Sequence, residues 1–440
     1  MNRTVLIVSP HFPPINAADM HRVRMGLPYF SEFGWDPVVL AVRPQDVEGV
    51  VEPLLLETLP PGLAVSRVAA LPVRFARLLG VGNLGLRAMP FLYSAGRSLL
   101  RSKRIDLVYF STTMFATMAL GRLWKQEFGV PFVLDMQDPW VNEYVERSSQ
   151  AQPPKYWLMR YVHRILEPWT MERADGLVAV SGDYIEALRR RYPKVTSLPA
   201  TTLPFGAAER DFEVARAHAQ ANRFFQPNDG ELHGVYVGRG GHDMAPALRV
   251  VLGALRQGLE QSPELFSRVR LHFIGTDYAP DRRSTQTVEP IAREMGVGAQ
   301  VQEHPRRIPY FEALQLLLDA DFLVVIGSDD AQYSASKIYP YILARKPLVG
   351  ALHEASNMWN ALRQIRTSIV PFSPDRPAAA YAQELAALWA NQLSRLPEIS
   401  RMDWSAFGAF RARELTREQC DLFDRVVEGK TCPVPVPSCA

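Results

Sequence analysis

A lysine flanked by serines and followed by a tyrosine is the first candidate for chemistry in this sequence. The residues concerned are Ser334, Ser336, Lys337 and Tyr341. We expect Ser336 to cap a helix, because Pro340 then falls in the first turn, where the missing proline N–H breaks no hydrogen bond. Tyr341 lies four residues after Lys337 and therefore on the same helix face. A lysine at a helix N-terminus favours a phosphate site; the alternative is a lysine side chain that points into water.

A glycine-rich turn with one arginine is the second candidate. Gly238, Arg239 and Gly240 follow an apolar run at 233–237 and precede a helix that we expect at 245–259. The backbone N–H groups of such a turn and of the helix N-terminus form a cradle for an anion, and Arg239 and Lys337 would add two positive charges. The turn lacks the G-x-G-x-x-G pattern of dinucleotide sites, so it predicts an anion and no particular nucleotide.

The third candidate combines polar residues from two loops of the first half. Asp138 follows an apolar run at 131–136, and His11 precedes Asn16 and Ala17 in the loop after the first apolar run. Two interpretations of Asp138 are open: it orients a substrate hydroxyl, or it caps the turn that the next proline begins. His11 likewise either binds a substrate or points into water.

Every candidate loop follows a short apolar run that we interpret as a β-strand. The runs of the first half lie at 5–8, 36–41, 106–110, 131–136 and 177–180, and those of the second half at 233–237, 268–275, 321–327 and 347–352. Helical stretches separate most of these runs, an order that is typical of α/β folds with parallel sheets. Ligands of such sheets bind beyond the carboxyl ends of the strands, where the candidate residues stand.

Length and composition favour a globular protein with two domains. A chain of 440 residues exceeds the ~250–300 residues that one hydrophobic core usually serves. Apolar residues make up 47% of the chain and charged residues 22%, and the net charge of +3 is too small to indicate nucleic-acid binding. No apolar run reaches the ~18 residues of a membrane-spanning helix, so we expect a cytoplasmic protein.

The cysteines indicate neither a disulfide framework nor a zinc site. Cys420, Cys432 and Cys439 are too few and too loosely spaced for either. The last two lie in the tail 429–440, where alternating prolines oppose both helix formation and sheet pairing. We therefore expect this tail to be disordered.

The stretch from Ser336 to Pro347 resembles the nucleotide-sugar-binding segment of glycosyltransferases with the GT-B architecture, and of the GT4-like families in particular. The residues that match this segment are Ser336, Lys337, Tyr341, Lys346 and Pro347. Further matches begin at Asp135, Ala174 and Ala320. The resemblance covers the chain from His11 to about Phe423. Its motifs are individually loose, but their order across two α/β halves is specific.

The resemblance implies an α/β fold of two facing Rossmann-like domains. Residues 1–205 would form the acceptor-side domain, and residues 206–402 would form the domain that binds the nucleotide sugar. Residues 403–428 would form a helix that returns to the first domain. The implied activity is the transfer of a sugar, such as a hexose, from a nucleotide-diphosphate sugar to an acceptor hydroxyl.

The resemblance also implies roles for individual residues. The catalytic residues would be Asp138, Arg239 and Lys337; the donor would contact Asn16, Ala17, Gly238, Gly240, Ser334, Ser336 and Tyr341; and His11 would lie on the acceptor side. Relatives are mostly retaining and need neither metal nor cofactor. The acceptor would be a glycan or a lipid-linked sugar in the synthesis of cell-surface polysaccharide or glycolipid.

Two alternatives to a transferase follow from departures from the family pattern. Pro340 stands where relatives have an acidic residue that binds the ribose, and residues 16–18 replace a glycine-containing loop. One alternative is a nucleotide-sugar epimerase on the same fold. The other is a protein of this fold that has lost catalysis and only binds a lipid or a partner protein.

The segment 67–104 is rich in basic residues. They are Arg67, Arg74, Arg77, Arg87, Arg97, Arg101, Lys103 and Arg104, and no acidic residue lies between them. Bulky apolar residues such as Phe75 and Phe91 are interleaved, a pattern that indicates binding to an anionic membrane surface. The alternative is a pair of helices with ordinary solvated arginines.

Overall fold

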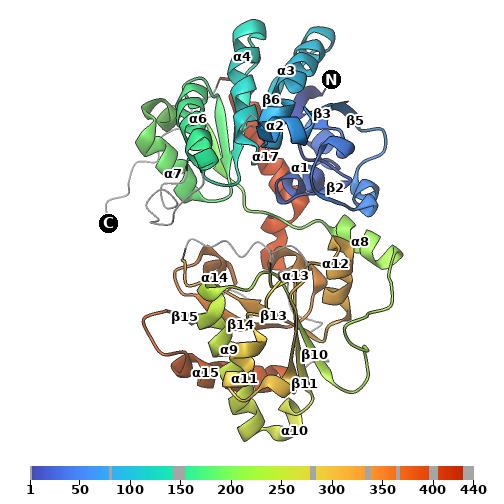
Figure 1. Ribbon diagram of the computed structural model, residues 1–440, viewed down its shortest axis with the longest axis vertical. Coiled ribbons are helices and arrows are strands. Elements are labelled where there is room, and N and C mark those ends of the chain that lie inside the picture. The colour runs from blue at the N-terminus through green and yellow to red at the C-terminus, as the bar shows by residue number, and fades with distance from the viewer. Residues whose placement is uncertain are drawn as a thin grey trace. The chain divides into compact units, whose positions relative to one another are not determined.

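The chain forms two compact units in the computed structural model, which describes residues 2–78, 82–141, 154–277, 284–331, 338–362, 367–395 and 405–429. Unit 1 comprises Met1–Gly206 and Phe410–Ala440, and unit 2 comprises Ala207–Ala409. Each unit contains one parallel sheet with helices packed against it (Figure 1). The prediction of an α/β fold with a parallel sheet in each half is confirmed.

Unit 1 is built on a seven-stranded sheet in the order β5-β3-β1-β6-β7-β8-β9, and every pair of neighbours is parallel. The strands are β1 (Arg3–Val8), β3 (Trp35–Val42), β5 (Ala64–Val68), β6 (Leu107–Ser111), β7 (Phe132–Met136), β8 (Gly176–Ala179) and β9 (Ala200–Thr202). A separate antiparallel pair joins β2 (Ile15–Asn16) to β4 (Val50–Val51). The central strands β6, β7 and β8 are buried along their whole length because helices cover both faces of the sheet.

The helices of unit 1 come from both ends of the chain. They are α1 (His21–Gly26), α2 (Val73–Leu78), α3 (Leu84–Ser102), α4 (Ala119–Phe128), α6 (Pro154–Met171), α7 (Gly182–Arg191) and α17 (Ala412–Val427). Phe423 of α17 lies against the rings of Phe30, Trp35 and Tyr109, with centroid distances of 6.2, 5.4 and 5.1 Å. The helix expected at 403–428 begins only at Ala412, because Ser405–Phe410 form a 3-10 turn and Arg411 is extended.

Unit 2 is built on a six-stranded parallel sheet in the order β12-β11-β10-β13-β14-β15. The strands are β10 (Leu232–Val237), β11 (Val269–Ile274), β12 (Val301–His304), β13 (Phe322–Ile326), β14 (Leu348–His353) and β15 (Ser368–Phe372). The helices are α8 (Glu209–Ala217), α9 (Ala245–Gln261), α10 (Pro263–Phe266), α11 (Glu289–Glu294), α12 (Tyr310–Asp319), α13 (Ile338–Ala344), α14 (Asn357–Leu362) and α15 (Ala378–Leu393).

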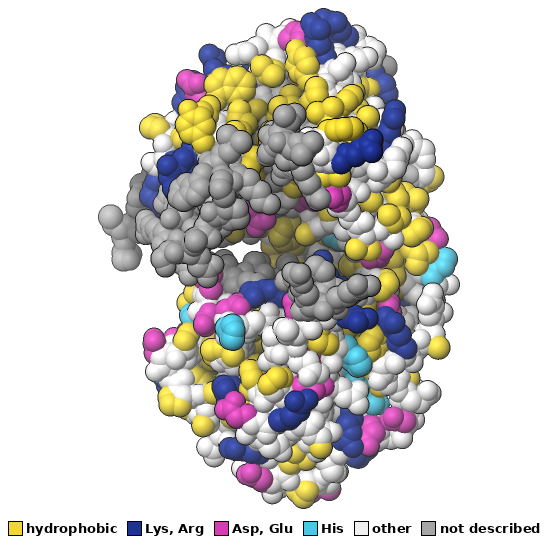
Figure 2. Space-filling model, in the orientation of Figure 1, with side chains coloured by type: hydrophobic (Ala, Val, Ile, Leu, Met, Phe, Trp, Pro, Cys, Tyr) yellow, Lys and Arg dark blue, Asp and Glu magenta, His cyan; other side chains and the backbone are white. Residues whose placement is uncertain are grey.

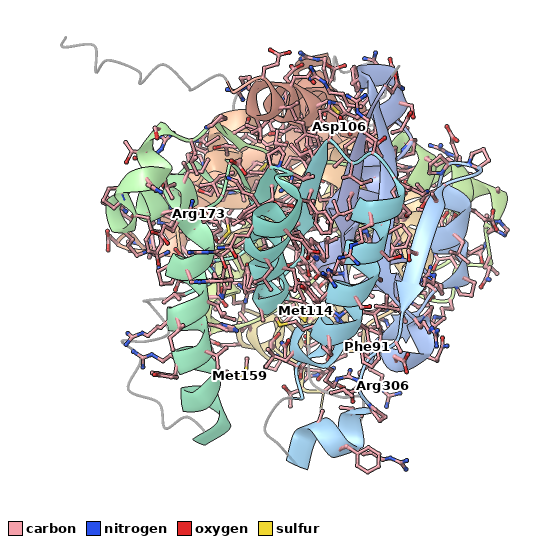
Figure 3. All side chains as sticks on the ribbon, turned by 90° about the horizontal axis from the view of Figure 1, so that it is seen from above. Phe91, Asp106, Met114, Met159, Arg173 and Arg306 are labelled. Atoms are coloured by element: carbon pink, nitrogen blue, oxygen red, sulfur yellow. The ribbon has the colours of Figure 1, made fainter. Side chains whose placement is uncertain are left out.

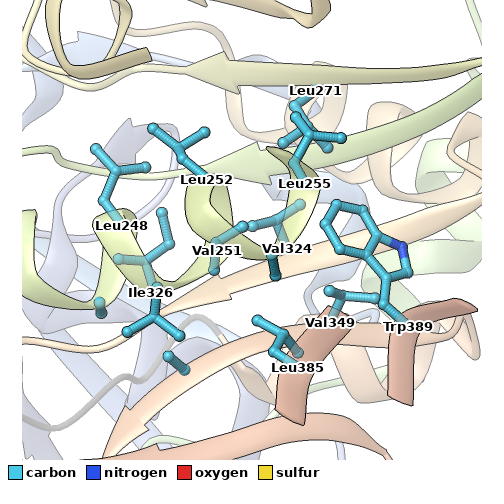
Figure 4. Packing of buried hydrophobic residues seen from close by; sticks show 14 of the residues in the cluster. Leu248, Val251, Leu252, Leu255, Leu271, Val324, Ile326, Val349, Leu385 and Trp389 are labelled. Carbon is cyan, nitrogen blue, oxygen red and sulfur yellow. The ribbon is translucent and has the colours of Figure 1, made fainter. Parts of the chain in front are cut away.

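The core of unit 2 lies between its sheet and the helices α9 and α15. Leu252 and Leu255 of α9, Val324 of β13, and Leu385 and Trp389 of α15 all have no exposed surface (Figure 4). This apolar contact holds α9 against the sheet, and α9 begins directly after the glycine-rich turn. The core thus fixes the position of the turn.

Strand order places a topological switch point in each sheet. In unit 1, β1 pairs with β3 on one side and with β6 on the other. In unit 2, β10 pairs with β11 on one side and with β13 on the other. The loops that leave two such neighbouring strands diverge to opposite faces of the sheet and open a crevice in which α/β proteins bind ligands. None of the helices in the described ranges is long and apolar enough to cross a lipid bilayer.

Candidate functional site

The carboxylate of Asp19 is the centre of the polar groups at the switch point of unit 1. Its Oδ1 lies 2.8 Å from Nδ1 of His11, in the loop after β1. Its Oδ2 accepts hydrogen bonds from Thr112 Oγ1 at 2.9 Å and from the backbone N–H of Thr113 at 3.0 Å, both in the loop after β6. Figure 3 labels the next residue, Met114, and so marks this loop. Asp19 therefore joins the two loops that border the crevice.

Asp19 is ionised at neutral pH despite its burial. Its side chain is only 3% exposed, and desolvation by itself would raise the pKa. The hydrogen bond and charge of His11, together with the hydrogen bonds from Thr113 and Thr112, outweigh this effect and lower the pKa. An ionised carboxylate only accepts hydrogen bonds, so His11 Nδ1, Thr112 Oγ1 and the Thr113 N–H must all donate.

Beneath this crevice lies a second buried carboxylate, Asp135, which closes β7. Arg22 Nε lies 2.9 Å from Asp135 Oδ2, and the hydroxyls of Tyr109 and Ser111 donate to the same oxygen at 3.0 and 2.7 Å. Gln137 donates to Asp135 at 3.1 Å and to the backbone carbonyl of Asp19 at 3.0 Å. Asp135 is fully buried, so we assign this network to support of the crevice floor and not to substrate binding.

The remaining candidates in unit 1 differ in their surroundings. Asp138 is exposed, yet partial desolvation and then the negative charge of Asp19 raise its pKa. The Asn16 amide donates to Glu52 at 2.8 Å, and Asn16 Oδ1 lies 3.0 Å from Nε2 of His21. Ala17 has an extended backbone with φ −128° and ψ 145°, so this position needs no glycine.

At the switch point of unit 2, the glycine-rich turn is tightly built. Gly241 has φ +154°, a conformation that a side chain disfavours, and a Cβ on Gly240 would lie 2.2 Å from Thr287 Oγ1. The N–H groups of Gly238 and Gly240 donate to the backbone carbonyls of Ile274 at 2.8 Å and Thr276 at 2.6 Å. The two predicted donor-binding glycines thus shape the turn, while their own N–H groups bind the chain that leaves β11.

Arg239 in this turn forms a bidentate pair with Asp243. Its two terminal nitrogens donate to Oδ1 and Oδ2 at 2.8 and 2.6 Å. Ser328, in the loop after β13, donates to Asp243 Oδ2 at 2.9 Å, and the N–H of Asp329 donates to the Asp243 carbonyl at 2.7 Å. The hydrogen bond from Arg239 is the largest cause of the lowered pKa of Asp243. Asp243 thereby joins the two loops of this crevice, as Asp19 does in unit 1.

Tyr341 contacts the last residue of the strand that precedes this turn. The N–H of Val237, the last residue of β10, donates to the Tyr341 hydroxyl at 2.8 Å, and the Tyr341 side chain is buried. In this arrangement Tyr341 ties α13 to the end of β10. Ser334, Ser336 and Lys337 lie outside the described residues, as does the predicted helix cap at Ser336.

Sequence reasoning missed the two central carboxylates, Asp19 and Asp243. Each has a neighbour in the chain that carries the opposite charge or a ring nitrogen: Asp243 is four residues after Arg239, and Asp19 is eight residues after His11. The first spacing is a signal that the sequence offers, because a tight glycine-rich turn brings residues on its two sides close together. The second is not, because the loop between His11 and Asp19 has no fixed geometry before folding.

Comparison with known proteins agrees with this architecture. Residues 22–206 match the family described as "Glycosyl transferase 4-like domain", a segment that covers most of the first part of unit 1. No curated protein sequence matches the chain.

Several solved structures have a similar fold across the whole chain. Alr3699/HepE from Anabaena, solved in complex with UDP, is 14% identical; the match covers 96% of this chain and 100% of that one, with a TM-score of 0.57. A UDP-forming α,α-trehalose-phosphate synthase from Burkholderia vietnamiensis is 13% identical over 97% and 100% of the two chains, with a TM-score of 0.57. A glycosyltransferase from Rickettsia africae ESF-5 is 11% identical over 98% and 100%, with a TM-score of 0.54.

The two parallel α/β sheets, each with a topological switch point, and these structural relatives together define the GT-B fold. The resemblance to GT-B glycosyltransferases that the motifs predicted is thereby confirmed. Within this class, residues 22–206 are similar to the glycosyltransferase 4-like domain.

Proposed function

We propose that the protein transfers a sugar from a nucleotide-diphosphate sugar to an acceptor hydroxyl. The observation that carries the proposal is Arg239 at the switch point of unit 2, oriented by Asp243 next to the start of α9. HepE, which shares the fold, has been solved with UDP and with UDP and glucose. A trehalose-6-phosphate enzyme from E. coli with the same fold was solved with UDP-2-fluoro glucose. UDP-glucose is therefore the first donor to test.

In this proposal the crevice of unit 2 binds the donor and the crevice of unit 1 binds the acceptor. Charge builds up on the diphosphate as its bond to the sugar breaks, and a fixed guanidinium stabilises that charge in the transition state. Arg239 would supply this interaction, with Lys337 as the second cation. The bidentate pair with Asp243 fixes the orientation of this guanidinium.

Finer features of the reaction are also proposals. The resemblance favours retention of configuration at the sugar and a reaction without metal, and it favours a glycan or lipid-linked acceptor in the synthesis of surface polysaccharide or glycolipid. A nucleotide-sugar epimerase remains the alternative enzyme. Incubation with a panel of nucleotide sugars separates the two, because a transferase releases the nucleoside diphosphate whereas an epimerase yields an isomeric nucleotide sugar.

Replacement of Arg239 tests the donor site. We expect Arg239→Ala to weaken UDP binding by about 1–3 kcal/mol, measured by isothermal titration calorimetry, because a charge-assisted hydrogen bond to phosphate is lost. Arg249→Ala is the matched control, since Arg249 lies on α9 of the same unit and pairs with the exposed Glu294. Equal UDP affinity in both variants would place the phosphate site elsewhere.

A further inference from the structure

The two oxygens of the Asp19 carboxylate have different partners. Oδ2 accepts from Thr112 Oγ1, from Thr113 Oγ1 at 3.2 Å and from the backbone N–H of Thr113. Oδ1 faces His11 Nδ1 at 2.8 Å, while Oδ2 is 3.1 Å from the same nitrogen. A backbone N–H cannot change from donor to acceptor, so the Oδ2 position must always hold an acceptor. The Oδ1 position has no such requirement.

This asymmetry decides where the proton sits on a neutral His11 ring. An ionised Asp19 accepts only, so Nδ1 must carry the hydrogen, and Nε2 is then a hydrogen-bond acceptor. Nε2 hydrogen-bonds to none of the residues in the described ranges, and the ring is 14% exposed. The ring therefore carries one oriented acceptor, Nε2, on a side chain that is partly exposed at the switch point of unit 1.

We propose that Asp19 is a positioning residue that holds His11 in the Nδ1–H tautomer, so that Nε2 accepts a hydrogen bond from a hydroxyl of the bound acceptor. The hydroxyl oxygen then bonds to C1 of the sugar as the bond from C1 to the nucleoside diphosphate breaks, and the hydroxyl proton passes to Nε2 of His11. This role rests on the proposed function, since it needs an acceptor hydroxyl in this crevice. Thr112 and Thr113 hold Asp19 in turn, which links the loops after β1 and β6 to the orientation of one ring nitrogen.

Asp19→Asn tests this role directly, because it should reverse the tautomer of His11 while the side chain at position 19 keeps its shape. Thr113 N–H requires an oxygen at the Oδ2 position, so the new amide nitrogen takes the Oδ1 position and donates to His11 Nδ1. His11 must then carry its hydrogen on Nε2, which becomes a donor and can no longer accept from a hydroxyl. Nitrogen-15 NMR of the imidazole nitrogens distinguishes the two tautomers, with His11→Asn identifying the His11 signals.

The functional readout is UDP release from UDP-glucose, with water as the acceptor. We expect Asp19→Asn to show the reversed tautomer and to lower kcat about 100-fold, because a misoriented reacting group costs on this scale. The dissociation constant for UDP should change less than about twofold, because the donor site lies in unit 2. His11→Asn keeps a donor for Asp19 but lacks Nε2, so it should lose a similar factor even if Asp19→Asn folds poorly. His218→Ala, an exposed histidine of unit 2, is the control.

The outcomes separate the inference from the proposed function. A wild-type ring with hydrogen on Nε2, or unchanged kcat in both Asp19→Asn and His11→Asn, would overturn the inference while donor binding stands. A wild-type protein that binds UDP-glucose but never releases UDP would also count against it, because water enters any site that admits a hydroxyl. A protein that binds neither UDP nor UDP-glucose would instead refute the proposed function, and the NMR result would still report the tautomer.

Discussion

At the scale of single residues, the histidine whose pKa is shifted most among the described residues is His272, which lies away from both switch points. His272 of β11 is 2% exposed, its Nε2 lies 3.0 Å from His233 Nδ1, and the Phe225 ring stacks on it at 4.7 Å. Burial is the main cause that lowers the pKa of His272 to about 3, followed by repulsion from His233. A neutral ring is thus part of the folded structure.

We expect this histidine to make unit 2 sensitive to acid. The folded pKa is below the unfolded value, so the contribution of His272 to stability is fully present above pH ~6.5 and falls as the pH drops toward 3. The loss would be on the order of 4 kcal/mol at the acid end. Denaturant unfolding at a series of pH values measures it.

His272→Leu provides the comparison for this prediction. It should reduce the stability at pH 7, since His233 loses a partner, yet flatten the decline between pH 6.5 and 4. The exposed His218→Leu should follow the wild type. Parallel pH profiles for wild type and His272→Leu would show that other groups cause the acid response.

At the scale of elements, one hydrogen bond connects the helix α13 to the strand that carries the glycine-rich turn. The Tyr341 hydroxyl accepts from Val237 N–H at 2.8 Å, one residue before Gly238. The sheet leaves this N–H without a strand partner, because the pairing of β10 with β13 includes only Gly234 and Val235. The tie sets the spacing between α13 and the turn that holds Arg239.

Removal of this hydroxyl should affect both stability and donor binding. We expect Tyr341→Phe to lower the free energy of unfolding by about 1–3 kcal/mol, because a buried backbone N–H loses its acceptor. UDP affinity should fall with it, since the turn is no longer held. Tyr381→Phe, which removes a hydroxyl acceptor from Ser373 N–H elsewhere in unit 2, is the control. Loss of stability in both variants with unchanged UDP affinity would restrict Tyr341 to a structural role.

At the scale of the whole molecule, exposed apolar surface is concentrated in unit 1. Of the ten large hydrophobic side chains that are exposed among the described residues, nine belong to unit 1 and only Leu388 to unit 2. Figure 2 shows hydrophobic side chains gathered over α3, α4 and α6 with basic side chains around them. The most exposed on the helices of this unit are Phe75, Tyr161 and Ile165, at 55%, 65% and 49%. In Figure 3, α2 and α6 extend toward the same edge of the view.

The structure reduces the number of basic groups that the segment 67–104 offers to a membrane. Arg67 and Arg87 are held by backbone carbonyls, Arg97 and Arg101 both pair with Glu127, and Arg104 pairs with Asp106. Arg74 remains exposed beside Phe75, with the guanidinium 4.6 Å from the ring centroid. Two acidic residues from outside the segment, Glu127 and Asp106, thus pair with three of the eight basic residues that the sequence shows as unopposed.

We therefore propose that the protein binds membranes through Arg74 and Phe75 of α2, which are both exposed. We expect sedimentation with phosphatidylglycerol vesicles at low salt, weaker binding to phosphatidylcholine vesicles, and a decline with added salt. Arg74→Ala should weaken binding by about 1 kcal/mol and Phe75→Ser should weaken it further. Leu388→Ser on unit 2 is the control. Equal binding to both lipids, or binding to neither at low salt, would show that these arginines form an ordinary solvated surface and do not bind membranes.

The amino-acid sequence by itself determined the elements and their order. The apolar runs 5–8 and 321–327 both form strands of a parallel sheet. Such strands are buried on both faces, which requires continuous apolar residues. The glycines at 240 and 241 likewise predicted a tight turn, which only residues without a Cβ can form here. Two α/β halves with parallel sheets were predictable because these signals are local and repeat along the chain, whereas the GT-B architecture was implied by the resemblance of the motifs to a known family.

Only the tertiary structure decided which polar groups meet. His11 is 8 positions from Asp19 in the chain and Thr113 is 94 positions away. The carboxylate of Asp19 nevertheless contacts both residues. Ser328 reaches Asp243 across 85 positions, and Glu127 reaches Arg97 across 30. Local patterns do not contain such distances, because strand order and crossover connections set which loops become neighbours. The positioning carboxylates and the neutralised arginines were therefore visible only after the sheets had formed.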